Sequence, residues 1–558
     1  MFIKTSRTNG YEYIKLVESY RDENNVTRHN VLFNFGRADK IKDTKSFANI
    51  VKRLCEIANI PLAETKPELD CSEAQMLKYG YLPYLKLWEK LGIGNTMRQM
   101  QSKTKCSFSL SEAAFLMVAQ HLLSPKSKLA TYEHQEDYLG LPDVELHQLY
   151  RTLEKLGEYK ESIEDDLFRE NYIKIGHKVD VVFYDVTTFA FESVIADELR
   201  NFGYSKDCKF KEVQVVMGLL IDSNGLPIGY ELFSGNTFDG KTMTAAIKNI
   251  QKRFGISKVI IVADRGLNSK GNLNAIKEAG YGYIVASKIK SMSKAVQEQI
   301  FDDAGYVIVS PEFRYKTIGY MNCFKDEEGR LCKLEENLVV SFSAKRANKD
   351  RKDRQRLIDK AAKLLANPAD IKSSKKRGGK KYISVSNSTE SYSLDEKRIE
   401  ADSKFDGYYG IQSSEKTMPA DEIIGAYRTL WRIEESFRVM KSTLEVRPVF
   451  HWKPERIHGH FVVCFLAFML ERKLEMLLNE QEIDNSPERI REALNSMQLA
   501  KVTLNDETVY IKAKGQPLAN HICRILKLKL PQNINTEEQL ASIFEIEQKT
   551  LWGQTCLF

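Results

Sequence analysis

The sequence predicts an α/β protein whose core is interrupted by a β-rich insertion and preceded by a small β module and a helical domain. Three observations support this expectation. Apolar, strand-like runs alternate with helical stretches from about residue 173 to 287, and helical stretches resume at about 415. Two of the apolar runs contain an aspartate, and a later helical stretch carries a glutamate among cations. Between these parts the alternation stops, and short β-like pieces surround a basic stretch.

Length and composition limit the possible classes of protein. A chain of 558 residues exceeds a single core. Its nine cysteines form no CxxC pair, which predicts reduced thiols. The first residues lack the apolar region of a signal peptide, and the longest apolar run, 461–470, is about half of a membrane span. We therefore expect a cytoplasmic protein that uses no membrane.

The hydrophobic pattern divides the chain into six regions. They are a β-hairpin module (1–45), a helical domain (46–172), the first part of the core (173–287), a β-rich insertion (288–414) whose basic arm runs from Lys345 to Lys381, the second part of the core (415–478), and a C-terminal region (479–558) that the pattern leaves unassigned. Within the core the expected order is strand, hairpin, helix, strand, helix, strand, with a turn at 223–225. This order is typical of an RNase H-like fold.

Two aspartates are candidate metal ligands because each is expected at the end of an apolar strand. Asp185 lies in VFYDVTTFAF and Asp264 ends KVIIVAD. A buried carboxylate is costly unless it is paired or binds a metal ion, and ligands gather at the carboxyl ends of strands in α/β sheets. The alternatives are structural. Asp185 would bond to a neighbouring threonine, and Asp264 would stabilise a turn or a helix start.

The third acid lies in YRTLWRIEESFRVMK, which we expect to form one helix. At about 100° per residue its face carries Tyr427, Leu430, Glu434, Arg438 and Lys441. An acid flanked by a ring and two cations suits a metal ion and a phosphodiester backbone better than a core. The alternative for Glu434 is a surface ion pair with Arg438.

Together the three acids predict a site for two Mg²⁺ ions, which Mn²⁺ can replace. Two such ions about 4 Å apart are held by bridging carboxylates and promote phosphoryl transfer. Asp185, Asp264 and Glu434 are the predicted catalytic residues and metal ligands. Asp239 is the main rival ligand. No phosphate-binding loop of the GxxxxGK[ST] type is present, so we expect no nucleotide cofactor.

These residues resemble the DDE transposases of bacterial insertion sequences, in particular the IS4-like group and its IS1634-type branch. The acidic helix of that group carries Tyr-x2-Arg-x3-Glu-x6-Lys, and Tyr427, Glu434 and Lys441 match it while Leu430 replaces the arginine. WRIEE (431–435) favours Glu434 over Glu435 as the catalytic acid. Further similar stretches are FGYSKD, GLPIGYELFSGNTFDGKT, VADRG and RPVFHWKPERIHGHF.

The resemblance implies a transposase that binds the inverted repeats of its element, frees 3′-hydroxyls at the ends and joins them to target DNA. It implies DNA contacts by Tyr427, Arg438 and Lys441, with Arg432 or Arg428 compensating for Leu430. It further implies a homodimer or larger assembly on two DNA ends, in the bacterial cytoplasm at the nucleoid. Two alternatives remain open: a structure-specific nuclease of the same fold, and a catalytically inactive DNA-binding protein.

Overall fold

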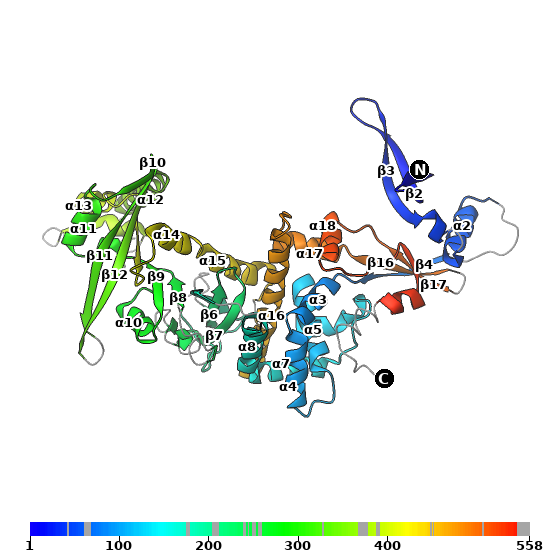
Figure 1. Cartoon of the computed structure of the whole chain (residues 1–558), viewed down its shortest axis with the longest axis horizontal. Coiled ribbons are helices and arrows are strands. Elements are labelled where there is room, and N and C mark those ends of the chain that lie inside the picture. Colours follow the sequence, from blue (N-terminus) through cyan, green and yellow to red (C-terminus); the bar gives the residue numbers. More distant parts are fainter. Residues whose placement is uncertain are drawn as a thin grey trace.

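The computed structural model describes most of the chain, which is elongated (Figure 1). The described residues are 1–41, 44–60, 69–174, 179–203, 211–237, 242–243, 245–247, 253–254, 259–325, 329–366, 378–386, 391–446, 449, 451–504 and 507–543. The N-terminal sheet and the strands of the insertion lie toward opposite ends of the long axis. The long helix α16 (Pro454–Asn479) stands between them.

The N-terminal module is a three-stranded antiparallel sheet, one strand more than the expected hairpin. Its strands are β1 (Phe2–Thr8), β2 (Tyr11–Arg21) and β3 (Thr27–Arg37), and helices α1 (Ala38–Ile41) and α2 (Lys45–Ile57) follow. The base of the sheet packs through Phe35 against Ile41 and Val509. The module therefore rests on the C-terminal region of the chain.

The region predicted to be helical, 46–172, begins with α2 and is helical again from residue 82 onward, but a strand lies between these helical parts. The elements are β4 (Leu69–Lys78), α3 (Leu82–Lys90), α4 (Ile93–Ser102), α5 (Leu110–Leu123), α6 (Lys128–Glu133), η1 (Gln135–Asp137), α7 (Leu146–Glu158), α8 (Lys160–Phe168) and the π-helical turn η2 (Arg169–Ile173). Serine side chains at 109 and 127 cap α5 and α6 by accepting main-chain N–H groups.

The central sheet contains the five strands expected from the apolar runs. They are β5 (Val181–Ala190), β6 (Gln214–Asp222), β7 (Pro227–Ser234), β8 (Ile260–Ala263) and β9 (Gly282–Ala286), with α10 (Lys270–Glu278) between the last two. Their spatial order is β7-β6-β5-β8-β9, and only the β5–β8 and β8–β9 pairs are parallel. The β6–β7 turn forms as predicted, with Gly225 at φ +88° and Asp222 accepting the N–H of Asn224.

Most strands of the insertion extend the central sheet, while β13 and β14 form a separate two-stranded sheet. After η3 (Ile289–Ser291) and α11 (Lys294–Phe301) the elements are β10 (Val307–Ser310), β11 (Phe313–Lys325), β12 (Leu331–Ser343), α12 (Ala344–Ala366), η5 (Gly378–Tyr382), β13 (Ile383–Ser386), β14 (Ser391–Leu394), α13 (Glu396–Ser403) and β15 (Tyr408–Ser413). The order β10-β11-β12-β15 continues from β9, so one nine-stranded sheet joins both parts.

Three helices after the insertion bring the chain back across the sheet. Helix α14 (Ala420–Arg428) contacts β8, β9 and β15, and α15 (Trp431–Arg438) contacts β5. The π-helical turn η6 (Val439–Thr443) continues α15 and leads to α16. Helix α16 packs against α3, α5, α7 and β7, and its apolar run 461–470 is fully buried.

The unassigned C-terminal region folds back onto the N-terminal part of the chain. Its elements are α17 (Pro487–Asn495), β16 (Gln498–Leu504), β17 (Glu507–Lys512), α18 (Pro517–Ile525) and β18 (Ile534–Thr536). Strand β16 pairs antiparallel with β4, which gives a second sheet of order β18-β17-β16-β4. None of the described helices is both long and apolar enough to cross a bilayer.

A pair of glycines allows α7 and α16 to cross closely. A Cβ atom on Gly459 would lie 1.9 Å from the carbonyl oxygen of Leu153, and one on Gly157 would lie 2.5 Å from that of Glu455. Both obstacles are main-chain atoms, so neither can move aside without displacing a helix. The HGH sequence at 458–460 therefore includes a glycine required for packing.

Helix α16 also buries a carboxyl group against α3. The Tyr84 hydroxyl donates a hydrogen bond of 2.5 Å to Oε2 of Glu471, and both side chains are buried. Burial, with the nearby Glu475 carboxylate, raises the pKa of Glu471 from 4.5 to about 8. Glu471 is therefore protonated in the folded protein at neutral pH, whereas the same carboxyl group is ionised in the unfolded chain.

We expect Gly459→Ala to lower the free energy of unfolding by about 3 kcal/mol, because the added methyl group meets main-chain atoms of α7. Urea denaturation followed by circular dichroism measures the change. Gly425→Ala is the matched control, since nothing lies within 4 Å of the added atom in α14. An unchanged stability in Gly459→Ala would contradict the close crossing.

The contribution of Glu471 to the free energy of unfolding should fall as pH rises from about 5 to 8. In that window the folded protein holds a proton on Glu471 that the unfolded chain releases, which contributes a slope of up to about 1.4 kcal/mol per pH unit. Glu471→Gln should remove this contribution. The stability of the variant, compared with that of the unmodified protein at the same pH, should therefore be more favourable at pH 8 than at pH 5. Denaturation midpoints of both proteins across the window test this; parallel pH profiles would contradict it.

Candidate active site

Parallel pairing of β5 with β8 makes Asp185 and Asp264 neighbours. The last pair in register is Tyr184 with Ala263, and in both strands the next residue is an aspartate. Adjacent strands lie about 4.8 Å apart, so the two carboxylates are at the same level of the sheet. Asp185 is not at the end of its own strand, as the sequence suggested, because β5 continues to Ala190. It lies where β8 stops.

Main-chain N–H groups orient both carboxylates. Oδ1 of Asp185 accepts the N–H of Val186 at 2.7 Å. Oδ1 of Asp264 accepts the N–H groups of Gly266 at 2.7 Å and Leu267 at 3.2 Å. The turn-stabilising role considered for Asp264 is thus present, and it engages only one of its two oxygens. Both side chains are half-buried.

Helix α15 runs along β5 in the same direction as the strand. Arg432 donates to the carbonyl of Ser223, next to the residue that pairs with Val182. Farther along, the Lys441 ammonium lies 5.7 Å from the ring centroid of Phe189. Val449 then pairs in parallel with Phe191. The helix and the strand therefore advance together.

This common direction brings Glu434 to the level of Asp185. From Lys441 back to Glu434 the helix covers about 10 Å, and from Phe189 back to Asp185 the strand covers about 13 Å. Asp185 and Phe189 share one face of the strand because side chains alternate. Glu434 is exposed. The third acid thus belongs to the helix that covers the face carrying Asp185.

The stretch expected to form one helix is divided into three pieces. Helix α14 ends at Arg428, α15 begins at Trp431, and a π-helical turn follows Arg438. At the first break the Leu430 N–H bonds to the carbonyl of Tyr427, three residues back, which tightens the chain. Leu430 is buried in the main core, so it does not share an exposed face with Glu434. The prediction of a single stripe was wrong.

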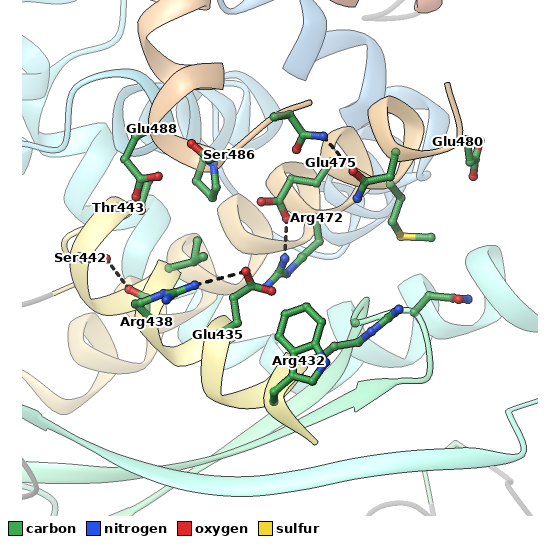
Figure 2. A pocket seen from close by; sticks show the side chains of 18 residues that line it. Arg432, Glu435, Arg438, Ser442, Thr443, Arg472, Glu475, Glu480, Ser486 and Glu488 are labelled. Atoms are coloured by element: carbon green, nitrogen blue, oxygen red, sulfur yellow. Dashed lines mark hydrogen bonds and ion pairs between the residues drawn. The ribbon is translucent and has the colours of Figure 1, made fainter. Parts of the chain in front are cut away.

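Glu435, the neighbour of Glu434, has a structural role (Figure 2). Its carboxylate lies 3.3 Å from Arg472 Nη2 and 3.3 Å from Arg438 Nη2, and Arg472 also pairs with Glu475 at 2.6 Å. These residues line a cavity between α15, α16 and the start of α17. Arg438 thus pairs with Glu435 and not with Glu434, against the alternative considered for Glu434. Among the described residues Glu434 forms no hydrogen bond or ion pair.

The four residues predicted to bind DNA have different surroundings. The Arg438 side chain is 72% exposed, and Arg432 is held by Ser223. Lys441 contacts Phe189. Tyr427 is half-buried; burial, the Tyr409 hydroxyl and the Asp264 carboxylate raise its pKa. DNA contact by all four residues stays a prediction.

The donor atoms suit Mg²⁺, although the side chains do not converge on one point. Mg²⁺ prefers oxygen ligands and keeps several waters, so two aspartates at the same level of a sheet are an appropriate pair. Across the described part of the chain, no three histidine, cysteine, aspartate or glutamate side chains are close enough to hold a metal ion. Asp239, the rival metal ligand, lies outside the described residues.

The histidines near residue 460 belong to the core. Nε2 of His460 lies 3.1 Å from the carbonyl oxygen of Val446 and 3.6 Å from the sulfur of Cys464. Nε2 of His121, on α5, lies 3.5 Å from the same sulfur. Burial lowers the pKa of His121 to about 3 and that of His460 well below 6.5, so both are neutral. They join α16 to its neighbours.

Sequence reasoning missed Tyr409. Its hydroxyl donates to the Tyr427 hydroxyl at 2.8 Å, and the ring centroids are 5.7 Å apart. The guanidinium carbons of Arg265 and Arg346 lie 5.9 Å and 4.3 Å from the Tyr409 centroid. Arg265 follows Asp264 in the VADRG motif, which was the available signal. The partners from β15 and α12 are brought there by the tertiary fold alone.

Comparison with known proteins identifies the family to which the chain belongs. Residues 177–470, which include the three acids, match the model of the transposase DDE domain. The match covers more than half of the chain, which therefore belongs to the DDE-domain transposases. Residues 3–65 match the model of the N-terminal domain of the IS1634 family transposases. None of the curated proteins searched matches the chain.

Nine solved chains match the fold. One is in the cryo-EM structure of the piggyBac transposase synaptic complex with hairpin DNA. It is 10% identical, with 77% of this chain and 83% of that chain covered, at a TM-score of 0.35. A similarity of this size carries no argument about the present site.

The two neighbouring glutamates should respond differently to substitution. Glu435→Ala removes a partner of the buried Arg472 and should lower the free energy of unfolding by about 1–3 kcal/mol. Glu434→Ala removes an exposed side chain and should change stability by less than about 0.5 kcal/mol. Urea denaturation of both variants measures this. Equal losses would contradict the separate roles given to the two acids.

Proposed function

We propose that this protein is an active transposase that cleaves the ends of its own insertion sequence and joins them to target DNA. The observation that carries the proposal is the placement of Asp185 and Asp264 side by side in register, below a helix that brings Glu434 along the same strand. The strand order β7-β6-β5-β8-β9 supports an RNase H-like core for this chemistry.

In the proposed site the three acids would hold two Mg²⁺ ions, or Mn²⁺ in their place. When bound, the ions would increase the nucleophilicity of the attacking oxygen and neutralise charge on the leaving one. Asp185 and Asp264 are already oriented by main-chain N–H groups, which lowers the entropic cost of assembling the ligands. The exposed Glu434 carboxylate reaches the site by side-chain rotation.

Two successive phosphoryl transfers make up the proposed reaction. In the first, a water oxygen attacks the scissile phosphorus, the phosphorus–O3′ bond breaks, and the 3′ oxygen leaves with a proton. In the second, that 3′-hydroxyl attacks a phosphodiester of the target, releasing a target 3′-hydroxyl. Arg438 and Lys441 would hold phosphates of the bound strand, and the 72% exposure of the Arg438 side chain supports this role. The chain forms no covalent bond to DNA.

Both DNA ends have to be held together for joining, so the proposed working form is a homodimer or larger assembly. The proposed partners are the inverted repeats and the target DNA. We place this activity at the bacterial nucleoid.

The deciding experiment incubates an end-labelled DNA fragment, spanning the gene and its flanks, with purified protein and Mg²⁺ or Mn²⁺. We expect metal-dependent nicks at a pair of inverted repeats, at least about 100-fold weaker in Asp185→Asn and Glu434→Gln because the ligand set is incomplete. Both variants should still bind the ends. Glu435→Gln is the neighbouring control and should retain cleavage.

Cleavage by Asp185→Asn would contradict the assigned acids. Cleavage without any strand-transfer product would indicate a nuclease instead of a transposase. Binding without cleavage by the unmodified protein would indicate an inactive DNA-binding protein.

A further inference from the structure

A cleft of about 520 Å³ opens beside the candidate active site, between the central sheet and the insertion. It begins at Arg265, the residue after Asp264, and extends along the first turns of α12 and the loop before β15. Its charged lining residues are Arg265, Lys288, Lys290, Arg346, Arg354, Asp350, Asp353, Asp402 and Asp406. It is distinct from the cavity in Figure 2, which lies on the Glu435 side of α15.

Three acids of this cleft are already engaged in ion pairs. Asp402 pairs with Lys290 at 3.3 Å and accepts the Tyr382 hydroxyl at 2.9 Å, and Asp406 pairs with Arg354. Asp353 lies 3.4 Å from Arg356, a residue outside the cleft lining. These pairs leave little negative charge to balance Arg265, Lys288 and Arg346, the three cations that we call the mouth of the cleft.

The cations at the mouth lack comparable partners. Among the described residues, Arg265 and Lys288 contact no carboxylate, and Lys288 has only the carbonyl of Asn268 at 3.3 Å. Arg346 has one long ion pair, 3.7 Å from Asp350, whose same oxygen also accepts the N–H of Gly407. The mouth is therefore positively charged and available to an anion.

Tyr409 brings two of these cations together. Arg265 and Arg346 both lie within 6 Å of its ring centroid, although one comes from the catalytic edge of the sheet and the other from the insertion. Two guanidinium groups on one ring repel each other, and an anion between them removes that cost. Through its hydroxyl Tyr409 also contacts Tyr427, close to Asp264.

We propose that Arg265 and Arg346 form a two-arginine clamp for a phosphodiester of the DNA strand bound at the acids. This inference rests on the proposed function and adds a specific DNA-backbone site to it. Guanidinium groups bind phosphate oxygens through paired N–H donors, which suits a backbone contact that reads no sequence. Arg265 follows a strand of the central sheet and Arg346 belongs to α12. The two arginines therefore come together only when the insertion is folded against the sheet.

The same clamp supplies the positive charge that Leu430 cannot. The two arginines suggested by the sequence as replacements are used elsewhere: Arg428 lies 4.9 Å from the Phe313 centroid, and Arg432 donates to Ser223. Leu430 itself is buried. Arg265 and Arg346 instead approach the partner ring of Tyr427.

The test measures binding of a fluorescein-labelled DNA duplex by the full-length protein at several salt concentrations, by fluorescence anisotropy without divalent metal. Each of Arg265→Ala and Arg346→Ala should reduce the slope of log Kd against log salt by about one, and the double variant by about two. Arg346→Lys should recover much of the slope. Arg356→Ala is the control, since it removes the same charge from the same helix outside the cleft.

Unchanged slopes in both arginine variants, or an equal loss in Arg356→Ala, would overturn the clamp. Thermal unfolding midpoints equal to that of the unmodified protein establish that each variant is folded. Cleavage assays separate the two proposals. Metal-dependent nicking with unchanged salt slopes would leave the transposase proposal standing without the clamp. Reduced slopes in a protein that never nicks DNA would leave the clamp standing as a DNA-backbone site.

Discussion

Parallel pairing of β5 with β8 determines where the other parts of the site must lie. Once Tyr184 pairs with Ala263, Asp185 and Asp264 become neighbours whatever the surrounding loops do. The helix with the third acid is then located by contacts to the same strand, through Lys441 on Phe189 and Val449 beside Phe191. A slip of one residue in β5 would turn Asp185 to the opposite face of the sheet. The register of β5 against β8 therefore determines how the three acids are arranged.

Continuity of the sheet connects this register to the insertion. Strand β15 pairs with β9, and β12 pairs with β15, so the strands that precede α12 are fixed relative to Asp264 by a chain of main-chain hydrogen bonds. Arg346 lies in the first turn of α12, directly after β12, so its position relative to Asp264 is fixed as well. A flexible tether could not hold its guanidinium group over Tyr409 with comparable accuracy. The insertion therefore forms one side of the candidate active site.

The parts of the fold read correctly from sequence are those with local signals. Buried strands such as β6 and β8 appear as short apolar runs, and a Gly225 turn marks the hairpin. The break before Trp431 was missed because no glycine or proline marks it; burial of Leu430 in the core accompanies the change. Pairing of β15 with β9, and the approach of Tyr409 to Tyr427, connect separate elements and leave no periodic signal. The choice of Glu434 over Glu435 came from a resemblance; the structure adds that Glu435 pairs with Arg472.

The pairing of β4 with β16 has a consequence for synthesis of the protein. A strand near the start of the helical region finds its partner only beyond α17, after most of the chain has been translated. Until then β4 has an unpaired edge, and the base of the N-terminal sheet lacks Val509 and Ile534, on which it packs. The nascent chain therefore cannot complete its N-terminal module on the ribosome. Premature termination would therefore release a molecule with an incomplete core and an unpaired β4 strand.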